Sequence, residues 1–194
     1  MSKPLKIILA TWFLAALALG LSGIPQRYPI IFVQSIGAST LLAQILAFSF
    51  IKSFRAEAMN WSLRTLTLFQ AWRIIPGALF LYYYYALGRL STDFAVIGGI
   101  GDILVGLVSI PAAPLGTADR PRLLKILLGV QLFGLVDLIF VLRAGVSAGL
   151  TTPEVMRPLT EMPLVLLPLI LVPITLFAHF VAIAQLIQRL RAGR

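Results

Sequence analysis

Residues 97–106 read IGGIGDILVG, an apolar and glycine-rich run with one carboxylate, Asp102, near its centre. The run lies within the longer apolar stretch 94–115, which reaches the roughly 20 residues that a helix needs to cross a bilayer. A charged side chain inside such a helix costs roughly 3 kcal/mol on insertion scales, so Asp102 is a candidate functional residue. Gly98, Asp102 and Gly106 are spaced four apart and share one helix face. Because small residues let helices approach closely, we expect Asp102 to face another helix.

The composition of the whole chain is that of an integral membrane protein. Of its 194 residues, 59% are hydrophobic and 12% are charged, against about 25% charged in a soluble domain. The absence of cysteine excludes disulfides, thiolate catalysis and iron–sulfur clusters, and the single histidine excludes a bis-histidine haem. No nucleotide-binding loop is present, and we expect no cofactor and no metal site.

Apolar runs long enough to cross a bilayer predict an all-α polytopic bundle, because unpaired backbone in lipid is too costly for open strands. We expect one transmembrane domain over residues 1–194. The six predicted transmembrane helices cover residues 7–24, 30–51, 66–87, 94–115, 124–145 and 163–186. The first run could instead be a signal peptide, since Lys3 and Lys6 precede it and LSG follows at 21–23, but its length suits a full span.

The distribution of basic residues predicts the orientation. With six crossings both termini share one side, and that side holds 11 basic residues: Lys3, Lys6, Lys52, Arg55, Arg64, Arg120, Arg122, Lys125, Arg189, Arg191 and Arg194. The opposite side holds 4, namely Arg27, Arg89, Arg143 and Arg157. Because cytoplasmic loops carry an excess of Lys and Arg, we expect both termini in the cytoplasm. The net charge of +9 is explained by this topology and does not indicate nucleic acid as a partner.

Three features lie near the ends of the predicted helices. Residues 52–65 mix basic and aromatic side chains, which predicts a short helix on the anionic inner leaflet. Within residues 146–162, the TTPE segment predicts a helix of one or two turns beginning at Pro153. The run of tyrosines at 82–85 is typical of an aromatic belt at the membrane interface, with a ligand-stacking cluster as the alternative.

Polar residues at membrane depth are the candidate ligand- or ion-binding residues. They are Arg73, Asp102, Asp137 and His179, supported by Gln70 and Gln131. At about 1.5 Å rise per residue, Asp102 and Asp137 each lie roughly 12 Å below the outer end of their helices, so they can share one level. Arg73 and His179 fall in the inner half. Because the connection 88–93 is short, the helices before and after it should be antiparallel neighbours, and we expect an Arg73–Asp102 ion pair.

Each of these four residues also has a structural interpretation that leaves function aside. Arg73 could extend to the inner surface, and Asp102 could be its counter-ion and nothing more. Asp137 could be protonated and bonded to a neighbouring helix, and His179 could be a neutral core histidine bonded to a carbonyl.

The last predicted helix contains three prolines five residues apart, at positions 163, 168 and 173. Pro163 begins the helix, whereas Pro168 and Pro173 each remove an N–H group and favour a kink. Carbonyls freed in this way need protein or cavity water as partners, so this helix is a candidate cavity wall, although prolines are also tolerated in ordinary membrane helices.

Gly99, Ile100, Gly101 and Asp102 together resemble the GxGD motif of intramembrane aspartyl proteases such as presenilins, signal peptide peptidases and prepilin peptidases. The resemblance implies that Asp102 and Asp137 form a catalytic dyad that activates water. In those families the second aspartate precedes the motif, whereas Asp137 follows it. The Pro-Ala-Leu motif of presenilins is absent, and the nearest text is PAAPL at 111–115.

A broader resemblance covers residues 69–186. The stretches FQAWRIIPGALFL, FAVIGGIGDILVGL, LFGLVDLIFVL and MPLVLLPLILVPITLFAHFVAI are similar to a family of small bacterial multi-pass proteins without an assigned activity. This resemblance implies a bacterial inner-membrane protein. It implies no chemistry.

The sequence favours a protein that binds or translocates a small polar ligand, an ion or a proton through a buried site between the last four helices. Catalysis as an intramembrane peptidase is the first alternative. The second is a non-catalytic subunit whose ion pairs direct assembly with a membrane partner. The bilayer is the expected environment, and a homodimer is one arrangement that the sequence leaves open.

Overall fold

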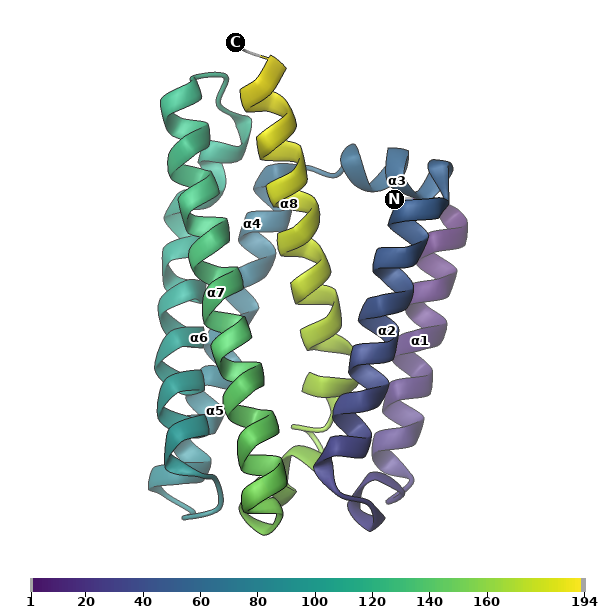
Figure 1. The fold of residues 1–194 in the computed structure, drawn as a ribbon, viewed down its shortest axis with the longest axis vertical. Helices are drawn as coiled ribbons and strands as arrows, with labels where there is room; N and C mark the ends of the chain where they lie inside the picture. Colours follow the sequence, from purple (N-terminus) through teal and green to yellow (C-terminus); the bar gives the residue numbers. More distant parts are fainter. Residues whose placement is uncertain (1, 193–194) are drawn as a thin grey trace.

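The computed structural model of the chain describes residues 2–192, and every element within that range is helical (Figure 1). Arg194, one of the predicted cytoplasmic basic residues, lies outside the described range. The longer helices are α1 (Lys3–Leu21), α2 (Ile30–Phe50), α5 (Ile74–Tyr85), α6 (Thr92–Ala112), α7 (Pro121–Thr151) and α8 (Val172–Ala192). The shorter ones are η1 (Pro25–Arg27), α3 (Lys52–Met59), α4 (Leu63–Phe69), η2 (Gln70–Arg73), η3 (Ala113–Thr117), η4 (Pro153–Thr160) and η5 (Leu167–Leu171).

Five helical stretches are long and apolar enough to cross a membrane: Lys3–Leu21, Ile30–Phe50, Thr92–Thr117, Pro121–Thr151 and Leu167–Ala192. The first residues of α1 and the last residues of α8 lie at the same end of the bundle (Figure 1). We call this the terminal end and the opposite one the far end. The short connections at 22–29, 86–91 and 152–166 lie at the far end.

The predicted continuous helix over 66–87 is wrong. In its place α4, the 3₁₀ turn η2 and α5 follow one another along the bundle. Pro76 explains the interruption, because a proline inside a helix cannot donate to the carbonyl four residues earlier and its ring clashes with that carbonyl. Here that carbonyl belongs to Trp72, within η2. Ser62 begins α4 by accepting a hydrogen bond from the Thr65 N–H at 3.3 Å.

The predicted bounds of the last two helices also need correction. The helix expected over 124–145 is α7, whose 31 residues make it longer at both ends. The helix expected to begin at Pro163 begins instead with the π-helical turn η5, and α8 continues to Ala192. The irregular segment lies between Pro163 and Pro173, with Pro168 inside η5, because each proline removes an N–H group from the helix.

The short helices follow the sequence more closely. The segment 52–65 contains α3, which runs across the terminal end of the bundle rather than along it (Figure 1). The helix expected at Pro153 is the 3₁₀ helix η4. In the tyrosine run, Tyr82 and Tyr85 are exposed, whereas Tyr83 and Tyr84 pack against the apolar core.

Helices α5, α6, α7 and α8 pack consecutively, and α2 packs on α8 and η5. Helix α1 contacts the bundle through η5, and most of its surface is exposed. Two apolar clusters fill the interior. One lies toward the far end and includes Phe80, Phe94 and Leu159, and the other lies toward the terminal end and includes Leu63, Leu127 and Leu186. The buried polar side chains include Arg73, Asp102, Gln131 and His179.

Candidate functional site

Arg73 is the centre of the buried polar site. Its side chain is 1% exposed, and it is among the largest fully buried side chains in the described residues. The η2 turn places it against α6, and the close approach of α5 to α6 depends on glycine. A Cβ at Gly77 would lie 2.7 Å from the Gly99 carbonyl oxygen. The interpretation in which Arg73 extends to the bundle surface is therefore wrong.

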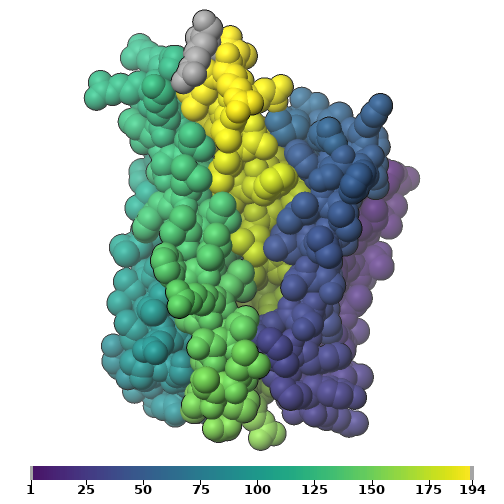
Figure 2. All heavy atoms as spheres, in the orientation of Figure 1, coloured from purple at the N-terminus to yellow at the C-terminus, as the bar shows by residue number. Residues whose placement is uncertain are grey.

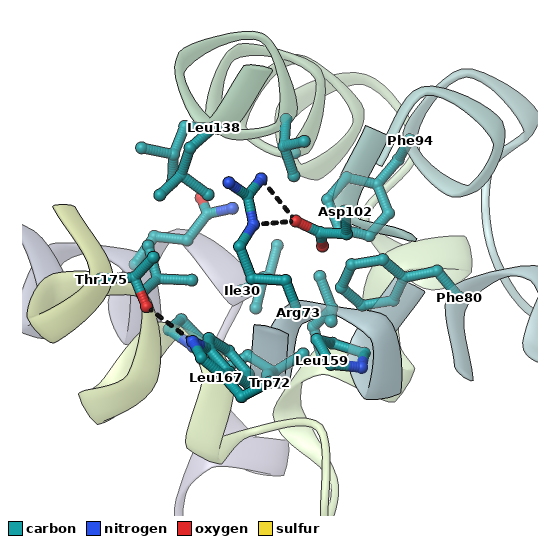
Figure 3. Close-up of a pocket in the computed structure, with 17 residues that line it drawn as sticks. Ile30, Trp72, Arg73, Phe80, Phe94, Asp102, Leu138, Leu159, Leu167 and Thr175 are labelled. Atoms are coloured by element: carbon teal, nitrogen blue, oxygen red, sulfur yellow. Dashed lines mark hydrogen bonds and ion pairs between the residues drawn. The ribbon is translucent and has the colours of Figure 1, made fainter. Parts of the chain in front are cut away.

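The Arg73 guanidinium bonds three groups on two helices. Its Nε and Nη2 both lie 2.6 Å from Asp102 Oδ1, which confirms the predicted ion pair (Figure 3). Nη2 also bonds Asp137 Oδ2 on α7, and Nη1 donates to the Gly134 carbonyl at 3.0 Å. One arginine thus joins α6 to α7 by bonding a carboxylate on each.

The glycine that precedes Asp102 has a structural explanation. A Cβ at Gly101 would overlap Asp137 Oδ1, so Asp137 approaches Arg73 across the bare backbone of α6. The GIGD sequence therefore describes a helix contact in which a carboxylate of the next helix lies against the glycine. A dyad that activates water is not needed to explain why the glycine is there.

The two carboxylates have different surroundings. Asp102, with a side chain 6% exposed, lines a cavity, whereas the Asp137 side chain is 12% exposed and does not line that cavity. Arg73 lies between them. The cluster therefore adjoins the cavity through Arg73 and Asp102.

A second polar layer lies beside the first, toward the terminal end. His179 Nδ1 lies 2.7 Å from Gln131 Oε1, and the Gln131 amide donates to Thr67 Oγ1 at 2.9 Å. Thr67 in turn donates to the Leu63 carbonyl at 2.8 Å. The His179 ring packs on Gly134, whose carbonyl accepts from Arg73, so the two layers meet at one residue of α7.

His179 and Gln70 each keep a buried polar atom without a partner. These atoms are His179 Nε2 and Gln70 Oε1, and neither has a hydrogen bond within the described residues. The structural interpretation of His179 predicts a carbonyl as its partner. In the structure that carbonyl is the side-chain oxygen of Gln131. Gln70 is 1% exposed and its amide lies 3.5 Å from the Leu66 carbonyl, so it is buried near the cluster without joining it.

The cavity that Asp102 lines has a volume of about 60 Å³ and lies in the far half of the bundle. Its walls come from α2, η2, α5, α6, α7, η4 and the η5–α8 junction, and they are mainly apolar (Figure 3). The polar lining residues besides Arg73 and Asp102 are Gln34, Trp72 and Thr175. Trp72 Nε1 donates to Thr175 Oγ1 at 3.1 Å, whereas Gln34 Oε1 is buried and has no hydrogen-bond partner among residues 2–192.

Sequence reasoning missed these last three residues. Gln34 lies within an apolar run, as Gln70 and Gln131 do, so the same test would have selected it. Trp72 and Thr175 carry no comparable signal, because uncharged aromatic and hydroxyl side chains are common throughout such helices. Among residues 2–192, no group of histidine, aspartate and glutamate side chains is arranged to hold a metal ion.

The charges of the cluster do not balance. Two carboxylates share one guanidinium, and no other charged side chain in residues 2–192 forms an ion pair with them. With both carboxylates ionised the cluster carries one excess negative charge. A buried charge is costly unless it is paired, so this site favours uptake of one positive charge.

Comparison with known proteins identifies a family to which no function is assigned. The match covers residues 30–187, which leaves out α1 and includes every residue of the polar site. It supports neither the bacterial origin nor the peptidase that the sequence resemblances imply. No curated protein and no solved structure matches the chain. The chain belongs to the family described as a domain of unknown function, DUF8737.

Proposed function

We propose that the chain is a six-span membrane protein in which the Asp102–Arg73–Asp137 cluster, beside an adjoining cavity, reversibly binds a proton and passes it across the membrane. The observation that carries this proposal is one buried arginine shared by two carboxylates. An unpaired negative charge at membrane depth is expensive, and a bound proton removes it. Release of that proton restores the charge, which gives the site two states.

The proposed topology takes α4, η2 and α5 as the sixth span beside the five continuous ones. Both termini are then on one side, and the excess of basic residues assigns that side to the cytoplasm. A bacterial inner membrane is the proposed location. The polar cluster then lies near mid-membrane, because Asp102 and Asp137 each lie near the middle of their helices, α6 and α7.

Irregular backbone beside the cavity supports the passage of a ligand or ion. Both η2 and the η5–α8 junction contribute to the cavity lining. Non-helical backbone at membrane depth is tolerated where it is buried in protein or lines a cavity, and discontinuous helices form the binding sites of many transporters. Asp102 and Arg73 line this cavity, which would give a proton access to the cluster.

The peptidase alternative is less compatible with this geometry. An aspartyl dyad needs two carboxyl groups that share a proton and hold a water between them. Here the Arg73 guanidinium bonds both carboxylates and occupies that position. The alternative of a non-catalytic subunit predicts that the charges serve assembly and that no proton moves.

Proton movement in reconstituted vesicles tests the proposal. Vesicles containing the protein and an internal pH-sensitive dye are given a pH gradient, and the rate of internal pH change is followed. We expect the wild type and the surface variant Asp93→Asn to conduct protons, and Asp102→Asn and Asp137→Asn to lose most of that rate. Equal rates in all four proteins, or a wild-type rate no higher than that of empty vesicles, would overturn the proposal.

A further inference from the structure

A groove at the terminal end of the bundle lies apart from the polar site. It is lined by Phe48 at the end of α2, by Lys52, Arg55, Ala56 and Met59 of α3, and by Ala184 and Gln188 of α8. Its volume is about 430 Å³. The α3 positions are spaced three and four apart and form one face of that helix, and the two α8 positions are spaced by four. Figure 2 shows α8 beside the corner between α2 and α3 at this end.

The groove combines hydrogen-bond donors with an apolar floor. Lys52, Arg55 and Gln188 supply the polar groups, and Phe48, Met59 and the two alanines supply the apolar surface. No carboxylate lines it. Glu57, the acidic residue of α3, accepts a hydrogen bond from the Ser2 backbone N–H instead. The groove therefore has positive charge beside apolar surface without acidic competition.

Arg55 holds the corner together. Its Nε donates to the Phe48 carbonyl at 2.8 Å, its Nη2 bonds the Ser49 carbonyl, and its guanidinium carbon lies 5.9 Å from the centre of the Phe48 ring. These bonds satisfy carbonyls at the end of α2, which have no partner within the helix. Lys52 is exposed and forms no ion pair in the described residues, so its ammonium is the free positive charge of the groove.

We propose that this groove binds one anionic phospholipid, with the phosphate at Lys52 and Gln188 and the upper part of an acyl chain against Phe48, Met59 and Ala184. Charge complementarity and the mixed lining support this occupant, because a soluble anion would leave the apolar floor in contact with water. The cross-bundle direction of α3 is that of a helix lying in the membrane interface. Basic residues next to a span attract anionic lipids, by about 1 kcal/mol per Lys or Arg near the surface.

Thermal unfolding in a neutral detergent tests this site without reference to proton binding. Phosphatidylglycerol is added to the wild type, and phosphatidylcholine with the same acyl chains is the comparison. A ligand that binds the folded state alone raises the melting temperature. We expect phosphatidylglycerol to raise it by several degrees and phosphatidylcholine to have a much smaller effect. Glycerol 3-phosphate, which has the headgroup phosphate without acyl chains, should have little effect.

Charge reversal locates the site. Lys52→Glu should lose at least half of the phosphatidylglycerol shift, whereas Lys125→Glu, a reversal of another exposed lysine at the same end, should keep it. Gln188→Glu introduces the same charge from α8 and serves if Lys52→Glu does not fold. Equal shifts in the groove variants and in Lys125→Glu, or equal shifts from both lipids, would overturn the proposal. A full shift from glycerol 3-phosphate would identify a soluble phosphate ester as the ligand and would also overturn it.

Discussion

Gly101 lies directly against the carboxylate of Asp137, so that a methyl group at position 101 would occupy the place of Asp137 Oδ1. This contact between α6 and α7 lets one arginine bond carboxylates on both helices. It also ties the glycine of the GIGD sequence to the buried charges rather than to a catalytic motif.

Gly101→Ala should destabilise the protein by about 1–3 kcal/mol, because overpacking forces either Asp137 or the α6 backbone to shift. The matched control is Gly129→Ala on α7, where an added Cβ meets nothing within 4 Å. That change should be neutral or stabilising by about 0.5–1 kcal/mol, since alanine is the better helix former. The free energy of unfolding in mixed micelles measures both. Similar stabilities for the two variants would show that the Gly101 contact is not tight.

The charges of the cluster predict an asymmetry between its members. Arg73→Gln leaves two carboxylates without a cation and should cost about 3–5 kcal/mol. Asp102→Asn leaves Arg73 paired with Asp137 in a neutral pair, so it should cost clearly less. The double variant should recover part of the Arg73→Gln loss, because one stranded carboxylate is removed. The measurement is a double-mutant cycle in the same micelles. Equal single losses that add without coupling would contradict the shared-arginine arrangement.

The second polar layer should behave as one unit. Gln131→Leu removes the partner of both His179 and Thr67 and should cost about 1–3 kcal/mol, because buried polar atoms lose their hydrogen bonds. Adding His179→Phe to this variant should cost less than His179→Phe costs alone, since the bond is already broken. Unfolding measurements on the two single variants and the double variant supply the coupling. A coupling free energy of zero would mean that the layer does not act as a unit.

The proposed orientation predicts which surface positions a reagent can reach. The chain has no cysteine, so any labelling of a single-cysteine variant comes from the introduced residue. Those placed at Ser2 and Ser53 should react with a membrane-impermeant maleimide only after the membrane is opened, and one at Ser147 should react in intact cells. Labelling of Ser53→Cys in intact cells would contradict the proposed orientation, because the terminal end would then lie outside the cytoplasm.

Much of the fold follows from patterns that the sequence carries. Long apolar runs predict the helices, and the spacing of Gly98, Asp102 and Gly106 correctly predicts that Asp102 faces another helix. The Arg73–Asp102 pair follows from the short connection between neighbouring helices. The break at η2 lies next to Pro76, a residue that disfavours a continuous helix. Because prolines are tolerated in membrane helices, Pro76 alone does not predict a break there.

The rest depends on three-dimensional packing. That Asp137 shares the same arginine depends on the rotation of α7, which no local pattern reports. The displaced start of the last helix reflects three prolines acting together. The cavity is bounded by residues from α2, η2, α5, α6, α7, η4, η5 and α8, so its lining could not be deduced from any one of them.

The protonation state of the cluster tests the central claim most directly. Infrared spectroscopy distinguishes a protonated carboxyl group from a carboxylate by its C=O stretching band. At neutral pH we expect the wild type to show the band of one buried protonated carboxyl group, which disappears in alkaline buffer. Asp102→Asn and Asp137→Asn, in which one carboxylate pairs with Arg73, should both lack it, and Asp93→Asn should keep it. A folded wild type without this band, or a band that persists in both site variants, would contradict the account.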